Sequence, residues 1–180
     1  MTQAEQDLAY IQDVVRESEN HLSAPRSIFF IWAAIYFIGF SLYDYAPQYV
    51  GAFWAIAGPA GGALSYWIGH RWALRSGAQS RQVARRHLLH WLGMVFAIFM
   101  VIPLAATGSI SADVLGKIIV LIAAFGLYVA GIYLVRPYLW IGIALAACYV
   151  GLLTVTNLPW TAVGAISGGA MLLAGLLANR

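Results

Sequence analysis

The chain has 180 residues, of which 62% are hydrophobic and only 9% are charged, whereas an ordinary soluble domain has about 25% charged residues. Its net charge of +3 does not indicate nucleic-acid binding, because the basic residues lie at the boundaries of apolar stretches and form no dedicated basic face. The composition therefore excludes a soluble catalytic domain and predicts one compact membrane domain.

The first 26 residues are predicted to be an amphipathic helix over 3–22 with a short linker, because Pro25 cannot continue a helix. An apolar stripe recurs at steps of three and four residues, as in a helix that packs on a partner surface. Its main residues are Leu8, Ile11, Val15 and Leu22. Helices that lie on anionic lipid usually carry Lys and Arg on the polar face, whereas this segment is net acidic, so lipid docking is the weaker interpretation. Packing against the protein's own inner surface is favoured. Binding to a second copy or a partner helix, or simple capping of the bundle, are the alternatives.

Six apolar stretches follow, and each is close to the 20 or so residues that a helix needs to cross the hydrocarbon. They are 27–45, 47–69, 89–107, 114–135, 138–156 and 160–178. The predicted fold is therefore all-α, a polytopic membrane protein whose residues 27–180 form a six-helix transmembrane bundle of three consecutive helical hairpins. Between the second and third stretches we expect a basic cytoplasmic loop over 70–87.

The Lys and Arg residues predict the orientation of this bundle. Nine of the ten lie in the first 26 residues, in alternate connections or at the chain end, and Lys117 is the exception. Cytoplasmic loops retain Lys and Arg, so both termini are expected in the cytoplasm. The compact size and short loops are typical of bacterial inner-membrane proteins. The seven Trp and ten Tyr residues, most of them near span ends, predict an interfacial anchoring belt.

Small residues gather in the second and sixth stretches. They include Gly58, Gly61 and Gly62 in one and Gly164, Gly168 and Gly169 in the other. Tight helix–helix packing is the ordinary role of such residues in a membrane. Alternatively, the glycines could break both helices, together with Pro59 in the second stretch, and could line with Ser167 a path for a neutral solute. The triplet Gly-Gly-Ala at 61–63 and 168–170 suggests an internal repeat of hairpins, although charge bias and aromatic residues alone would look similar.

The histidines and the few ionisable residues are the candidates for chemistry. His70, His87 and His90 lie at the inner rim, where they could hold haem or a metal ion, although the arginines around them disfavour a bound cation. Asp113 and Lys117 have the spacing of a helical ion pair. Asp44 could join Asp113 in a shallow cation-attracting mouth at the outer face. No catalytic residue is predicted, since the serines of the spans and the histidines lie at different depths.

Three functions are consistent with these features. The first is a non-enzymatic membrane protein, a scaffold or regulatory subunit, that acts by assembly through its cytoplasmic face. Its candidate contact residues are those of the apolar stripe together with Arg75, Arg81 and Arg85. Its expected partners are membrane lipid, copies of itself, or another membrane or cytoplasmic protein. The second is a small transporter or channel for a neutral solute, and the third is a haem- or metal-binding membrane protein.

Overall fold

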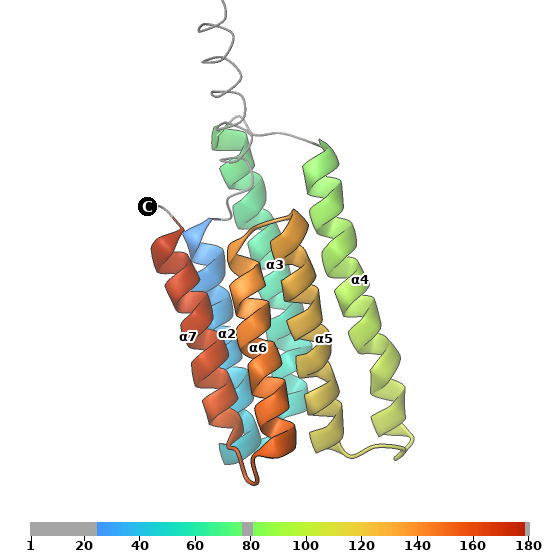
Figure 1. The fold of residues 1–180 in the computed structure, drawn as a ribbon. Helices are drawn as coiled ribbons and strands as arrows, with labels where there is room; N and C mark the ends of the chain where they lie inside the picture. Colours follow the sequence, from blue (N-terminus) through green and yellow to red (C-terminus); the bar gives the residue numbers. More distant parts are fainter. Residues whose placement is uncertain (1–24, 77–80, 179–180) are drawn as a thin grey trace, which may run out of the picture.

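The computed structural model describes residues 25–76 and 81–178. The regular secondary structure of this part of the chain is all helical, and its long helices lie side by side in one bundle (Figure 1). The predicted helix over 3–22 lies outside the described residues. In chain order the helices are α2 (Arg26–Tyr45), the short 3-10 helix η1 (Pro47–Tyr49), α3 (Val50–Ser76), α4 (Arg81–Ala106), α5 (Ala112–Tyr133), α6 (Pro137–Thr154) and α7 (Trp160–Leu177).

Five of the six long helices have the length and the apolar composition of a membrane span. They are α2, α4, α5, α6 and α7. The predicted all-α, multi-pass membrane protein is confirmed at this level. The helix that is not among the five, α3, has 27 residues but is less apolar, because glycines, Pro59 and polar residues interrupt its hydrophobic sequence.

Two helices are longer than their apolar stretches. The predicted loop over 70–87 is mostly helix, since α3 continues to Ser76 and α4 begins at Arg81. The reason is that Arg, Gln and Ala are good helix formers, so the arginines mark the edge of the apolar stretch without ending the helix. In Figure 1 the ends of α3 and α4 extend beyond those of the other four helices.

The helices pack in the order α3, α2, α7, α6, α5, α4. The most extensive contacts are between α2 and α7 and between α5 and α6. At the two edges, α3 packs on α2 and α4 packs on α5, and the backbones of α3 and α4 make no contact with each other. The three predicted hairpin pairs, α2 with α3, α4 with α5 and α6 with α7, pack against each other, but the most extensive contact in the bundle, that of α2 with α7, joins the two ends of the described chain.

Glycines allow the close pairs. Gly164 and Gly168 of α7 lie against the backbone of α2. A Cβ added at Gly164 would be 3.0 Å from the carbonyl oxygen of Phe37, and one added at Gly168 would be 2.9 Å from that of Ala33. Gly142 of α6 packs against the backbone of α5 at Tyr128. Lipid tails provide no hydrophobic force between helices, so this close contact over small residues stabilises the bundle. The predicted role of Gly164 and Gly168 in tight packing is confirmed.

The core contains more aromatic side chains than the predicted belt implies. Tyr36 and Phe40 of α2 are buried, and their rings contact the ring of Trp54 of α3 at centroid distances of 6.0 and 5.5 Å. Phe40 also stacks on Trp160 of α7 at 6.0 Å. These rings therefore join α3, α2 and α7.

Candidate functional site

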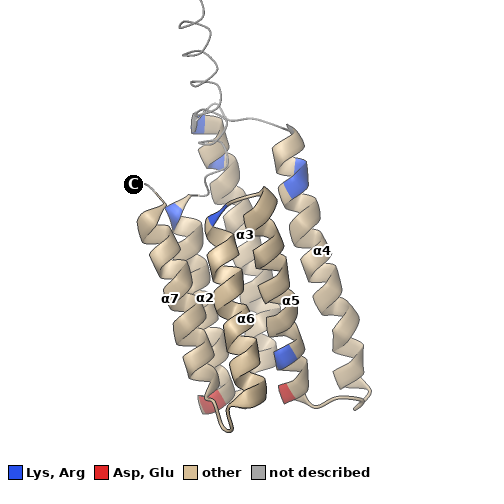
Figure 2. Ribbon diagram, viewed as in Figure 1, with Lys and Arg blue, Asp and Glu red and all other residues tan. Residues whose placement is uncertain are grey.

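The charged residues of the described chain separate into two ends of the bundle. Every described arginine lies at the end formed by the start of α2, α4 and α6 and the end of α3, here called the arginine end (Figure 2). The opposite aspartate end carries Asp44, Asp113 and Lys117. Within residues 25–76 and 81–178 these two aspartates are the only acidic residues. The arginine end therefore has no carboxylate from the described chain.

The three predicted rim histidines do not form one site. His70 is exposed on α3 and stacks on the ring of Tyr66, with centroids 6.1 Å apart. His87 and His90 are on α4, which has no backbone contact with α3. Among the residues that the structure describes, no group of three or more His, Cys, Asp or Glu side chains is close enough to hold a metal ion. The predicted three-histidine site is thus not assembled by the bundle.

His90 instead contacts the neighbouring helices. Its Nδ1 is hydrogen-bonded to the hydroxyl of Tyr133 at the end of α5, and its ring lies edge-on to Trp91 at a centroid distance of 5.1 Å. Trp91 in turn contacts Tyr138 of α6. These side chains connect α4, α5 and α6 near the arginine end. The sequence shows both residues but not their pairing, because His90 and Tyr133 are 43 positions apart.

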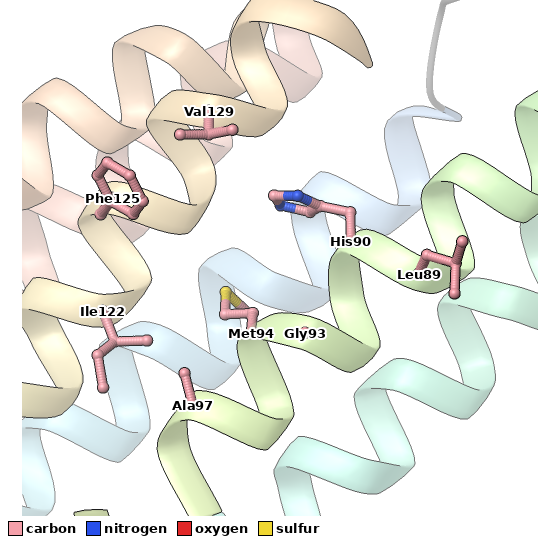
Figure 3. A pocket seen from close by; sticks show the side chains of 8 residues that line it. All are labelled: Leu89, His90, Gly93, Met94, Ala97, Ile122, Phe125 and Val129. Carbon is pink, nitrogen blue, oxygen red and sulfur yellow. The ribbon is translucent and has the colours of Figure 1, made fainter. Parts of the chain in front are cut away.

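A groove of about 320 Å³ runs between α4 and α5 beside His90. Figure 3 shows the imidazole reaching from α4 toward α5, with Met94 below it and Val129 and Phe125 on the opposite wall. The remaining lining residues are Leu89, Gly93, Ala97 and Ile122. The histidine is the one ionisable side chain in an otherwise apolar lining, so the groove suits an acyl chain or another apolar surface and offers no constellation for catalysis.

Removing the Tyr133 hydroxyl should loosen the contact between α4 and α5. We expect Tyr133→Phe to lower the free energy of unfolding by about 1 kcal/mol, the usual contribution of one hydrogen bond. Tyr128→Phe is the matched control, since Tyr128 is also on α5 and is 42% exposed. Unfolding of both variants in the same detergent measures the difference, and equal stability of the two variants would contradict a role for this hydrogen bond.

At the aspartate end one prediction is confirmed, and Asp44 has a contact that the sequence did not predict. Lys117 Nζ lies 2.8 Å from the Asp113 carboxylate, so the predicted ion pair is present. The cation-attracting mouth of Asp44 and Asp113 stays a prediction, and Asp44 has hydrogen-bond partners on α7. Its carboxylate accepts hydrogen bonds from the backbone amides of Trp160 and Thr161, at 3.1 and 2.7 Å, and from the Thr161 hydroxyl at 2.6 Å. Asp44 therefore caps the N-terminus of α7, whose own N-cap residue, Pro159, provides no side-chain acceptor.

The residues of the predicted solute path lie on different surfaces. Both helices that carry them are continuous, so the predicted breaks are absent. Gly61 and Gly168 face α2 from α3 and from α7, respectively, whereas Gly58, Gly62 and Gly169 have open space where a Cβ would stand. Ser167 is fully buried and donates its hydroxyl to the carbonyl of Val163. None of these six residues lines the groove beside His90 or a second groove between α2 and α3 near Phe53.

The predicted contact residues are only partly described. Leu8, Ile11, Val15 and Leu22 lie outside the described residues, and of Arg81 only the backbone, at the start of α4, is described. Arg75 and Arg85 are exposed near the ends of α3 and α4 that extend beyond the bundle. The contact surface at the arginine end is thus exposed where the structure describes it.

Comparison with models of known protein families, with curated proteins and with solved structures finds no match to this chain.

Proposed function

We propose that the chain crosses the membrane six times, with the arginine end in the cytoplasm. The sixth span is α3, whose 27 residues extend about 40 Å at 1.5 Å per residue. It runs beside α2 and returns the chain to the arginine end, where α4 begins (Figure 1). The arginines at this end support the orientation through the positive-inside rule.

The function that we propose is assembly in the membrane, as a scaffold or regulatory subunit that binds copies of itself or a partner helix. The observation that carries it is the unoccupied face of α3. Along this face four glycines, Gly51, Gly58, Gly62 and Gly69, have no atom within 4 Å of where a Cβ would stand. Ala55 lies between them and is exposed. At steps of three, four and seven residues, these positions share one side of the helix.

The composition of α3 provides an independent argument. α3 is the one long helix of the described chain that is not apolar enough to count as a membrane span by itself. A helix of this kind is better covered by another helix than by lipid, and small residues allow two backbones to approach closely. The edge position of α3, which packs only on α2 and η1, leaves this face accessible to a partner.

The oligomeric state tests the proposal. Native mass spectrometry of gently solubilised protein should detect a homo-oligomer. Gly62→Leu should weaken it about tenfold or more, because overpacking an interface costs about 1–3 kcal/mol and 1.4 kcal/mol is a factor of ten. Gly169→Leu is the matched control, since Gly169 occupies the same place in the second Gly-Gly-Ala triplet and also has open space.

A wild-type protein that stays monomeric at all concentrations and recovers no partner would contradict assembly. Equal weakening by Gly62→Leu and Gly169→Leu would contradict the face of α3 as the contact surface. Because a Cβ added at either position would have no atom within 4 Å, both variants should insert and fold as the wild type does.

A further inference from the structure

The charges of the chain are unevenly divided between the described residues and residues 1–24. Five of the seven acidic residues, Glu5, Asp7, Asp13, Glu17 and Glu19, belong to 1–24, together with a single arginine, Arg16. The arginine end of the bundle has no described carboxylate. Residues 1–24 are joined to this end through Arg26, so the acidic segment and the basic surface are neighbours in the chain.

The basic surface also contains exposed apolar side chains. Near the end of α3, Trp67, Arg71 and Leu74 are spaced so that they share one face of the helix, and both Trp67 and Leu74 are about half exposed. The guanidinium of Arg71 lies 4.1 Å from the centroid of the Trp67 ring. Near the start of α4, the exposed Arg85 and Leu88 lie one turn apart. The backbones of α3 and α4 make no contact with each other. The exposed side chains at the end of α3 and at the start of α4 are therefore not covered by the other helix.

The N-terminal segment has a complementary pattern. At 100° per residue, a helix over 3–22 places Leu8, Ile11 and Val15 on one stripe. On the same helix Asp7 lies along one edge of the stripe and Glu19 along the other. An apolar stripe with acidic edges matches a surface of leucines and tryptophan flanked by arginines.

We propose that residues 3–22 dock as a helix on the ends of α3 and α4 of the same chain, with the apolar stripe against Leu74 and Leu88 and the edge carboxylates beside the arginines. The short connection through Pro25 makes this binding intramolecular and so raises its effective concentration. An anionic lipid surface is a poorer partner, because it repels an acidic segment. The docking does not depend on the proposed assembly, since it needs only one copy of the chain.

Disulfide trapping tests the docking. In a Cys148→Ser background, which removes the single native cysteine, Ile11→Cys combined with Leu74→Cys or with Leu88→Cys should form an intramolecular disulfide under mild oxidation. Gln6→Cys is the control, because position 6 falls on the opposite face of the predicted helix. The product should migrate as a monomer on a non-reducing gel and lose two hydrogens by mass spectrometry. Disulfides found only between two chains, or none from Ile11→Cys to either helix, would overturn the proposal.

A pair of charge reversals gives a second, independent test. Glu19→Lys, at the edge of the stripe, should lower the yield of the Ile11–Leu74 disulfide about two- to fivefold, as expected for an exposed ion pair. Glu17→Lys makes the same change of charge on the opposite face and should leave the yield unchanged. The measurement is made in nanodiscs of neutral lipid. An equal loss in both variants, or a disulfide that forms only when anionic lipid is added, would overturn docking on the arginines.

Discussion

Replacement of Gly142 by alanine should destabilise the bundle more than the same replacement at any other glycine of α6 or α7. The added Cβ would stand 2.7 Å from the Cα of Tyr128 and 2.8 Å from the carbonyl oxygen of Ala124, both in the backbone of α5. Backbone atoms within a helix cannot rotate away, so α5 and α6 must separate. We expect a loss of about 3 kcal/mol in the free energy of unfolding, the upper end of the cost of overpacking a core.

Gly169→Ala is the matched control, and its effect should have the opposite sign. Its Cβ would meet no atom within 4 Å, and alanine is favoured over glycine within a helix by up to about 1 kcal/mol. Reversible unfolding of both variants in one detergent compares them directly. If Gly142→Ala is as stable as Gly169→Ala, then α5 and α6 do not approach as closely as the structure indicates.

The glycine contacts also show what the sequence could predict about the packing of the helices. The GxxxG spacing of Gly164 and Gly168 predicted a tight contact, and the structure contains it. The sequence could not identify α2 as the partner, since the two helices lie at opposite ends of the described chain. Gly142 and its counterpart on α5, Gly131, form no recognisable motif. Their role follows only from the close approach of α5 and α6, which no local pattern encodes.

The charged segment between the second and third apolar stretches shows a different limit of prediction from the sequence. Hydropathy locates the point where a segment becomes apolar, and for α3 and α4 that point lies inside the helix. α3 ends only at Ser76 and α4 already begins at Arg81, because the residues there favour a helix regardless of solvent. The apolar pattern thus located the long helices well, whereas it misplaced these two helix ends by about two turns.

The two Gly-Gly-Ala triplets have the same arrangement in the structure. In both, the first glycine, Gly61 or Gly168, faces α2, and the second, Gly62 or Gly169, has open space. α3 and α7 therefore use the same triplet to flank α2 from its two sides. The outer position is free on both helices, and it is the edge helix α3 that the proposed assembly uses.

For the candidate sites, single residues were visible in the sequence and their partners were not. His90 was identified as a possible ligand, but Tyr133, which binds it, belongs to the next helix. The sequence does contain a signal for the cap of α7. The segment before Trp160 ends in Pro159 and has no side-chain acceptor at the N-cap, so the helix needs an acceptor from elsewhere. Asp44, the single acidic residue near the junction of the first two apolar stretches, was the natural candidate.

Asp44→Ala should therefore loosen α7 at its N-terminus. The substitution removes the carboxylate that accepts from the amides of Trp160 and Thr161 and from the Thr161 hydroxyl, and with it the favourable charge at the helix N-terminus. We expect a loss of about 1–2 kcal/mol, as for other N-cap residues. Amide hydrogen exchange should locate the effect, with faster exchange at Trp160 and Thr161 and little change in the middle of α7.

Asp113→Ala is the control for charge, because it removes the other aspartate of the same end, whose side chain is 53% exposed and pairs with Lys117. An exposed ion pair contributes only about 0–1 kcal/mol, so this variant should be the more stable of the two and should leave exchange at Trp160 unchanged. Asp44→Asn should fall between wild type and alanine, since its single carbonyl oxygen replaces two acceptors. If all three variants exchange alike at Trp160 and Thr161, Asp44 does not cap α7. The contact between α2 and α7 would then be held by their glycines and aromatic rings alone.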